Sequence, residues 1–239
     1  MKKLINSIKK ILGYDGSCFQ RRYELYKKKH NSSTKKLMDN HATDILEILF
    51  DVAQKNEILL WVEFGTLLGA YRDKDFISHD YDLDTGMYAS DYSLLFEDEL
   101  IDRGFVKKRS LYQKDTITND YILTEVTFEY KGLSVDIFFS FKEDDKKRQV
   151  YVYGFENEQY AKENKYNVRE YQLPIVNVLE NLKIKELIVK GPLKPEETLI
   201  EIYGINFMTP DPLWNTTKSA LNVKVYPISE RYANKKGKW

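Results

Sequence analysis

The chain has 239 residues, enough for one domain of generous size with a substantial buried core. Its 37 Lys and Arg residues balance 37 Asp and Glu residues, so bulk charge gives no reason to expect a nucleic-acid partner. The single cysteine, Cys18, excludes an intramolecular disulfide framework and a cysteine-rich zinc module, and it is compatible with a reducing, intracellular compartment.

Residues 1–14 predict a short basic amphipathic helix. At about 100° per residue its apolar side chains share one arc and its lysines lie on the other side. The apolar residues are Leu4, Ile5, Ile8, Ile11 and Leu12. The segment lacks the apolar run and the cleavage site of a signal peptide, and no part of the chain approaches the ~18 apolar residues of a membrane span. Two interpretations stay open, because such a helix can dock on the domain or lie on an anionic membrane surface.

Hydrophobic periodicity predicts helices and strands along the rest of the chain. The first half should contain a helix over 33–54, a strand over 58–62, a brief helix over 67–71, an acidic strand over 81–88 and a helix over 90–103. The middle should contain strands over 105–109, 121–130, 133–141 and 149–155. After these we expect an extended segment over 173–179 and a helix over 196–203. The expected organisation is a basic N-terminal segment (1–32), one domain (33–212) and a polar tail (213–239).

Residues 65–87 join a turn of small residues to the acidic run Asp80-x-Asp82-x-Asp84. In an extended segment every second side chain shares a face, so Asp82 and Asp84 should point the same way, with Asp80 at the entrance. Like charges packed that closely are unfavourable unless a cation neutralises them. Hard oxygen ligands suit Mg²⁺ or Mn²⁺, which commonly bind substrate phosphates as well. An EF-hand calcium loop is excluded, because Thr85 separates the acids from the glycine that such a loop needs at once.

Asp136 stands inside an otherwise apolar strand, Ser134-Val-Asp-Ile-Phe-Phe-Ser140. A buried carboxylate without a partner is costly. A metal shared with Asp82 and Asp84 would be such a partner, and a hydrogen bond or an exposed strand edge is the structural alternative.

Candidate substrate-binding residues surround the acidic run. They are Gly65, Thr66, Gly69, Arg72, Lys74 and His79. The backbone of the turn and the Thr66 hydroxyl could reach a phosphate, helped by the start of the following helix. Arg72 is the candidate phosphate clamp, because a guanidinium can bind phosphate through two hydrogen bonds. For Lys74 and His79 a place on the loop surface is the competing explanation.

The chain resembles the LicD/fukutin family in an ordered set of motifs. They are Gly65-Thr-Leu-Leu-Gly-Ala-Tyr-Arg72, Phe76-Ile77, Asp82-Leu-Asp84-Thr-Gly-Met87, the Val-Asp-Ile-Phe strand at Asp136, and Tyr203-Gly204 with Met208-Thr-Pro210. Together they cover roughly residues 40–212. The resemblance implies an α+β fold with a polymerase-β-like nucleotidyltransferase core, in which helices flank a mixed or antiparallel sheet.

The resemblance also implies metal-dependent transfer of a phospho-alcohol from a CDP-alcohol donor to a sugar hydroxyl of a cell-surface glycan. Phosphocholine, ribitol phosphate and glycerol phosphate are groups of this kind, and capsule, lipopolysaccharide and teichoic acid are such glycans. Asp82 and Asp84 would hold Mg²⁺ or Mn²⁺ against the donor, and Asp136 would complete the metal shell or accept the proton of the acceptor. Tyr81 departs from the family by replacing one acid. The expected location is cytoplasmic, at the inner face of the cell membrane, where residues 1–14 would bring the enzyme to a lipid-linked acceptor.

Two alternatives remain open. A nucleotide-sugar-dependent glycosyltransferase also uses an Asp-x-Asp metal site, although it does not explain the Gly65-Thr66 turn or Asp136. An inactive relative that binds a nucleotide or a glycan is the non-enzymatic alternative. Stabilisation by CDP-alcohols, by nucleotide sugars or by neither distinguishes the three.

Overall fold

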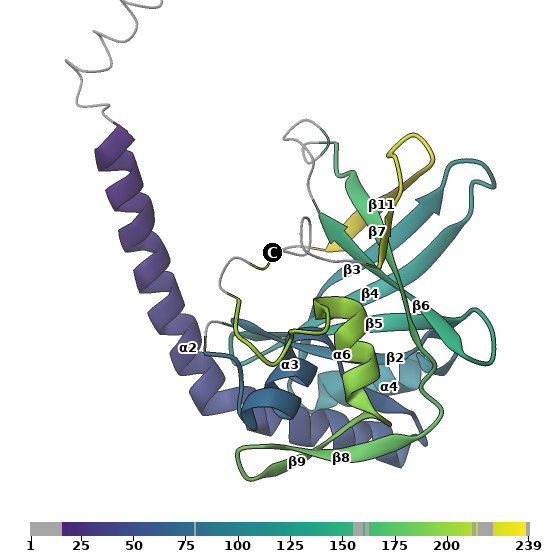
Figure 1. Ribbon diagram of the computed structural model, residues 1–239, viewed down its shortest axis with the longest axis horizontal. Coiled ribbons are helices and arrows are strands. Elements are labelled where there is room, and N and C mark those ends of the chain that lie inside the picture. Colours follow the sequence, from purple (N-terminus) through teal and green to yellow (C-terminus); the bar gives the residue numbers. More distant parts are fainter. Residues whose placement is uncertain are drawn as a thin grey trace, which may run out of the picture.

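A long helix and a strand-rich body make up the structure (Figure 1). The computed structural model describes residues 16–78, 80–154, 160, 163–211, 214 and 222–237, of which 16–32 are described as helical backbone alone. The predicted amphipathic helix at 1–14 and the candidate His79 lie outside the described residues. No helix in the described part of the chain is long and apolar enough to cross a membrane.

Helix α2 (Gly16–Lys55) packs its second half against the body, while its first half projects away (Figure 1). Its buried apolar side chains recur at helical spacing: Met38, Ala42, Ile45, Leu46, Leu49 and Val52. They share the main core with α4 (Leu94–Asp102) and with the strands beneath. At the start of α4 the Ser93 hydroxyl accepts the Phe96 N–H at 3.2 Å, a typical N-cap.

Six antiparallel strands close into a barrel. They are β3 (Val106–Asp115), β4 (Tyr121–Tyr130), β5 (Leu133–Lys142), β6 (Lys147–Gly154), β7 (Tyr166–Pro174) and β11 (Arg231–Gly237). Around the barrel the order is β5-β4-β3-β11-β7-β6, and β6 returns to β5. That last pairing covers only Ser140–Lys142 of β5. Earlier residues of β5 pair in parallel with β2 (Asp82–Tyr88), so the barrel opens beside β2.

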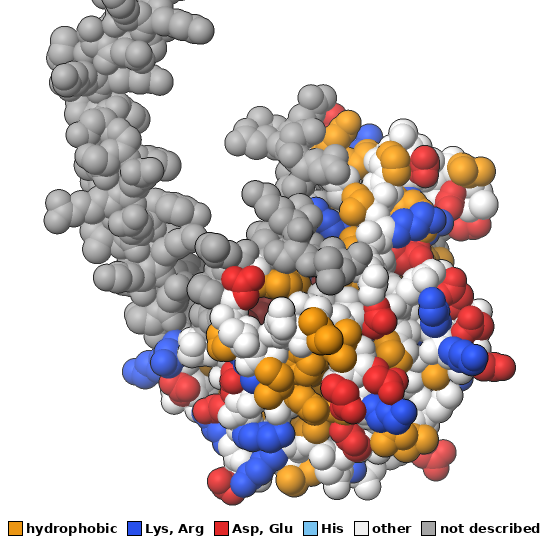
Figure 2. Space-filling model, in the orientation of Figure 1, with side chains coloured by type: hydrophobic (Ala, Val, Ile, Leu, Met, Phe, Trp, Pro, Cys, Tyr) orange, Lys and Arg blue, Asp and Glu red, His pale blue; other side chains and the backbone are white. Residues whose placement is uncertain are grey.

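The other elements flank this opening. Strand β1 (Leu60–Val62) pairs with β2, and β10 (Val223–Val225) pairs with β7. Between β1 and β2 the chain forms α3 (Phe64–Leu68) and a π-helical turn (Gly69–Asp73). The hairpin of β8 (Leu179–Ile184) and β9 (Leu187–Pro192) leads into α6 (Pro195–Tyr203). Figure 2 shows hydrophobic side chains over α6, and the exposed ones in this part of the sequence are Leu193, Ile200, Ile205 and Met208.

The expectation of an α+β nucleotidyltransferase core flanked by helices is wrong. The described residues are mostly β, with eleven strands, four α-helices and the closed antiparallel barrel. Local sequence patterns do not predict the closure, because the closure depends on β7 and β11. Residues 231–237 lie in the segment expected to be a polar tail, yet they pair with both β3 and β7.

Candidate functional site

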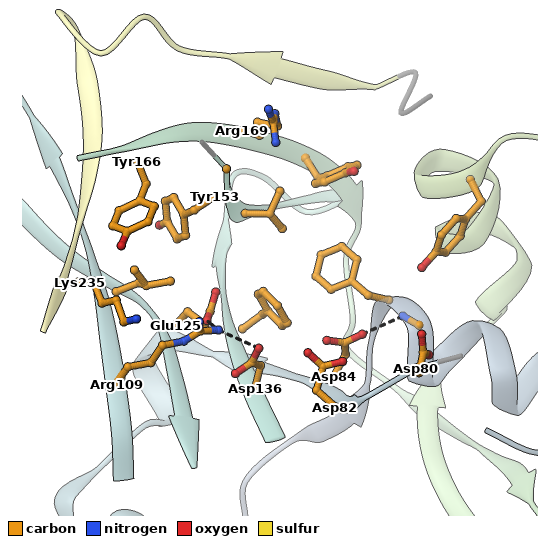
Figure 3. Close-up of a pocket in the computed structure, with 18 of the residues that line it drawn as sticks. Asp80, Asp82, Asp84, Arg109, Glu125, Asp136, Tyr153, Tyr166, Arg169 and Lys235 are labelled. Atoms are coloured by element: carbon orange, nitrogen blue, oxygen red, sulfur yellow. Dashed lines mark hydrogen bonds and ion pairs between the residues drawn. The ribbon is translucent and has the colours of Figure 1, made fainter. Parts of the chain in front are cut away.

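A cavity of about 570 Å³ lies at the opening of the barrel (Figure 3), within the range usual for small-molecule sites. Every strand of the barrel contributes to its wall, for example through Arg109, Glu125, Asp136, Gly154, Arg169 and Lys235. Strand β2 adds Asp82 and Asp84 on the side where β6 has left β5. The barrel and its parallel extension therefore form one site.

Three carboxylates form a cluster in this cavity. Asp82, Asp84 and Asp136 each offer an oxygen within 4.8 Å of the others. Asp82 and Asp84 share a face of β2 because they are two residues apart, and Asp84 lies opposite Asp136 in the parallel ladder. Three hard oxygen donors converging from two neighbouring strands fit a divalent cation such as Mg²⁺ or Mn²⁺.

The turn before β2 holds Asp84 in place. The Gly65 N–H donates to Asp84 Oδ2 at 2.9 Å (Figure 3), and the Asp84 N–H donates to Thr66 Oγ1 at 2.8 Å. A Cβ at residue 65 would lie 2.8 Å from Asp80 Oδ2 and 3.2 Å from Asp84 Oδ2, so any larger residue would push these carboxylates aside. Phe64 has a φ of 41°, in the left-handed region that a bulky residue rarely adopts. Gly65 therefore binds Asp84 through its N–H and leaves room for both carboxylates.

Burial and mutual repulsion raise the pKa values of the acids. Burial, followed by the charges of Asp136 and Asp80, raises the pKa of Asp82 to about 7. Burial raises the pKa of Asp80 to about 6 and holds the pKa of Asp84 well above its usual range. Without a cation Asp82 and Asp84 therefore still hold protons as the pH approaches 7, whereas Asp80 is largely ionised there. A divalent ion would replace those protons, which is the chemical behaviour expected of a metal site.

Arg109 ties the cluster to the barrel. Its Nη2 donates to Glu125 Oε1 at 2.7 Å and to Asp136 Oδ2 at 3.0 Å (Figure 3). Its Nε donates to Thr127 Oγ1 at 2.6 Å, and Thr127 in turn donates to the other oxygen of Asp136. Burial raises the pKa of Glu125 to about 8, and Arg109 opposes that shift. Asp136 is thus both a member of the carboxylate cluster and a hydrogen-bonded carboxylate, so the two alternatives considered from the sequence do not exclude each other.

Among the predicted substrate-binding residues in the described part of the chain, Gly65 is the one that lines the cavity. Its N–H is engaged by Asp84. Thr66 is 4% exposed, and its hydroxyl accepts the N–H of Asp84 in β2. Gly69 lies in the π-helical turn, where a Cβ would come within 2.5 Å of the Asp75 carbonyl oxygen. Thr66 and Gly69 therefore shape the surroundings of the site without facing the cavity.

The two predicted basic residues that are described lie outside the cavity wall. Arg72 binds the Asp73 carboxylate through Nε and Nη2, each at 2.8 Å. It is close enough to Asp80 for its charge to lower the pKa of that acid. Lys74 is exposed and lies over the Tyr71 ring, 5.4 Å from its centroid.

The cationic and aromatic residues of the cavity wall were not among the predicted site residues. The residues concerned are Arg109, Tyr153, Tyr166, Arg169, Tyr171 and Lys235. Burial, followed by the charge of Arg109, lowers the pKa of Lys235 to about 8. The available signal was that Arg169 and Tyr171 are two residues apart and so share one face of a strand. From sequence alone, polar residues on one face of a strand indicate that this face is exposed to solvent. Only the closed barrel shows that the face points into a cavity.

The chain matches a protein-family model described as LicD/FKTN/FKRP, nucleotidyltransferase domain, over residues 57–177, just over half of its length. It is also similar to two proteins named "Ribitol-5-phosphate transferase FKTN". The one from Macaca fascicularis is 25% identical over 194 residues, which are 79% of this chain and 38% of that protein. The one from Homo sapiens is 24% identical over 194 residues, with the same shares of 79% and 38%.

A Caenorhabditis elegans protein named "Uncharacterized protein T07A5.1" is 30% identical over 126 residues, 51% of this chain and 32% of that protein. The chain thus spans less than two fifths of the length of these relatives. The family match contains the three clustered aspartates as well as Arg109 and Arg169.

Proposed function

The chain belongs to the LicD/FKTN/FKRP family of nucleotidyltransferase domains, and from this premise we propose that it is a metal-dependent transferase of phospho-alcohols. The donor would be a CDP-alcohol and the acceptor a sugar hydroxyl of a glycan. The observation that carries the proposal is the cluster of three carboxylates inside a cavity of about 570 Å³. The names of the two FKTN relatives support ribitol phosphate as the first group to test.

In this proposal Asp82, Asp84 and Asp136 hold the cation. The set of hard oxygen donors and the raised pKa values of Asp82 and Asp84 fit Mg²⁺ or Mn²⁺. A cation bound there supplies charge neutralisation for the transferred phosphoryl group and for the departing CMP. Gly65 keeps Asp84 oriented through its N–H at 2.9 Å.

We assign Asp136 to the metal shell. Arg109 and Thr127 engage its two oxygens from the barrel side, which fixes the carboxylate. A fixed acid suits a ligand better than a base that gains and loses a proton during turnover.

Apolar rings line the cavity next to the acids. Phe64 and Phe138 pack edge to face with their ring centroids 4.8 Å apart, and both line the cavity. They reduce the water around the carboxylates, and electrostatic interactions with a bound phosphate are stronger in a drier site.

The test combines binding and turnover. CDP-ribitol, CDP-glycerol, CDP-choline, UDP-glucose and GDP-mannose are each added with Mn²⁺ or Mg²⁺ to the wild type, to Asp84→Asn and to Asp98→Asn. Asp98 is an exposed carboxylate on α4 and serves as the matched control. Thermal stabilisation and slow release of CMP are measured.

We expect one CDP-alcohol to stabilise the wild type and the control in the presence of metal and to release CMP. In Asp84→Asn the release should fall on the order of 10³-fold. A response to a nucleotide sugar alone would move the assignment to a glycosyltransferase. Equal CMP release by the wild type and Asp84→Asn would refute the role of the cluster.

A further inference from the structure

One wall of the cavity carries an arginine that lacks an acceptor. Arg169 on β7 lines the cavity and is 5% exposed. Its Nε has no hydrogen-bond partner, and within the described part of the chain no ion pair involves its guanidinium. Burial of a cation without an acceptor is unfavourable. A ligand that brings an acceptor would remove this penalty.

The barrel leaves room for this guanidinium. Arg169 lies opposite Val152 in the β6–β7 ladder, and Gly154 follows two residues later on the same face of β6. A Cβ at Gly154 would lie 2.5 Å from Arg169 Nη1 and 3.1 Å from its Cζ. Gly154 is not among the glycines with positive φ, so its backbone conformation does not require glycine. The close approach of Arg169 explains the residue instead.

Two further donors on the cavity wall also lack partners. The hydroxyl of Tyr171, which is 0% exposed, and the indole Nε1 of Trp214 make no hydrogen bond. Tyr171 is two residues from Arg169 and shares its face of β7. Burial raises the pKa of Tyr171 to about 12, and the charge of Arg169 opposes the shift, so the hydroxyl keeps its proton at neutral pH. Asn167, two residues before Arg169, also lacks partners for its amide oxygen and nitrogen, but it does not line the cavity. The three unsatisfied donors that do line the cavity are suited to an anion.

This wall is separate from the carboxylate cluster. Strand β6 pairs on one side with β7, which carries Arg169, and on the other with β5, which carries Asp136. Figure 3 shows Arg169 on the far side of the cavity from Asp82, Asp84 and Asp136. Arg109, by contrast, is already paired with Glu125 and Asp136. Arg169 therefore lines the same cavity as the acids without pairing with any of them.

We propose that Arg169, with Tyr171 and Trp214, forms an anion subsite that binds a phosphate group of a substrate. Guanidinium favours phosphate because it can donate two parallel hydrogen bonds to it. The phosphate belongs either to the nucleotide of the donor or to the acceptor, and this choice alone rests on the proposed function. The subsite itself exists whether or not the protein is a transferase.

The test measures anion binding to the full chain in EDTA, so that the carboxylate cluster cannot contribute through a metal. The probes are inorganic phosphate, CMP, glucose 1-phosphate and glucuronate, each titrated by calorimetry. The variants are Arg169→Gln, which removes the charge, and Gly154→Ala, which displaces the guanidinium while keeping it. Arg103→Gln is the matched control, because Arg103 is an exposed arginine with its side chain 48% accessible.

We expect phosphate to bind the wild type and Arg103→Gln alike, and its Kd to rise at least tenfold in Arg169→Gln and in Gly154→Ala. The melting temperature of Arg169→Gln should stay equal or rise, because the variant loses an unpaired buried charge. A merely structural arginine would lower it. Unchanged phosphate binding in both variants, preference for glucuronate over phosphate, or a lower melting temperature in Arg169→Gln would overturn the proposal.

The probes also identify the source of the phosphate. If the nucleotide occupies the subsite, the affinity for CMP falls in Arg169→Gln; if the acceptor does, the affinity for glucose 1-phosphate falls and that for CMP is retained. In turnover assays the KM of that substrate should rise at least tenfold with little change in kcat. Phosphate binding that depends on Arg169 in a protein that turns over no CDP-alcohol would support the subsite and refute the proposed function. Turnover that depends on Asp84 and is insensitive to Arg169 would support the proposed function and refute the subsite.

Discussion

Removal of one charge from the carboxylate cluster should stabilise the metal-free protein and impair metal binding. The variant Asp82→Asn keeps the shape of the side chain and removes its charge. Burial and the charges of Asp136 and Asp80 raise the pKa of Asp82 from 3.8 to about 7. The folded protein therefore holds this proton more tightly than the unfolded chain does.

The sign and size of the effect follow from that difference in pKa. Below about pH 4 both states hold the proton, and the charge of Asp82 has no effect. As the pH rises towards 7 the unfolded chain loses its proton first, so the wild type loses stability through this window, and above about pH 7 the loss is complete. The shift from 3.8 to about 7 corresponds to about 4 kcal/mol. Rearrangement of the neighbouring acids makes the actual destabilisation smaller. We therefore expect the free energy of unfolding of Asp82→Asn at pH 8 to be about 2–4 kcal/mol higher than that of the wild type, which corresponds to a melting temperature roughly 5–15 °C higher.

Denaturation in EDTA at several pH values between 4.5 and 8 measures this difference. Asp98→Asn on the exposed side of α4 controls for the loss of any carboxylate. Adding Mn²⁺ at pH 8 should reverse the order, because the wild type gains binding free energy that the variant largely lacks. The reasoning would be refuted by an Asp82→Asn protein less stable than the wild type in EDTA at pH 8. A difference that narrows as the pH rises would refute it equally.

Two further substitutions, at Gly65 and Thr66, test the supports of the site, and a third, at Arg148, tests a buried ion pair outside the cavity wall. Gly65→Ala should weaken Mn²⁺ binding at least tenfold in calorimetry, because its Cβ would lie 2.8 Å from Asp80 Oδ2; unchanged affinity would show that the acids move aside freely. Arg148→Met should lower the free energy of unfolding in urea by about 3–5 kcal/mol. It leaves the carboxylate of Glu63, 2.8 Å from Arg148 and 0% exposed, without its counter-ion, and a loss under about 1 kcal/mol would contradict a buried ion pair. Thr66→Val should cost about 1–3 kcal/mol in the same assay, because the β2 N–H that donates to its hydroxyl at 2.8 Å becomes unsatisfied; no loss would mean that water replaces the hydroxyl.

The sequence predicted well where local chemistry decides the structure. Residues 121–130, with their β-branched and aromatic side chains, form β4 over the predicted range. Asp82 and Asp84 share one face of β2 because their spacing alone requires it. The structure also brings Asp136 beside them, while the role of all three as metal ligands stays a prediction.

The sequence failed where a turn lacks its usual residues and where a distant strand decides the structure. The hairpin of β8 and β9 turns at Lys185, whose φ is 53°, so no glycine or asparagine marks the turn. Strand β11 is rich in lysine and looks like a solvated tail, yet β3 and β7 pair with it on either side. No local pattern in a single sequence contains that pairing, and the barrel could not be predicted without it.

The separation of charge in the cavity has no explanation in stability. Arg109 shows that this fold can pair a buried arginine with the acids, since it lies 3.0 Å from Asp136. Arg169 lies on β7, and β6 lies between β7 and the strand that carries Asp136. Gly154 has no side chain that would contact the guanidinium of Arg169. A chain shaped for stability alone would bring the opposite charges together or replace both. Buried groups that break this rule mark functional sites, and a ligand that meets a cation on the carboxylates at one end and Arg169 at the other would satisfy both.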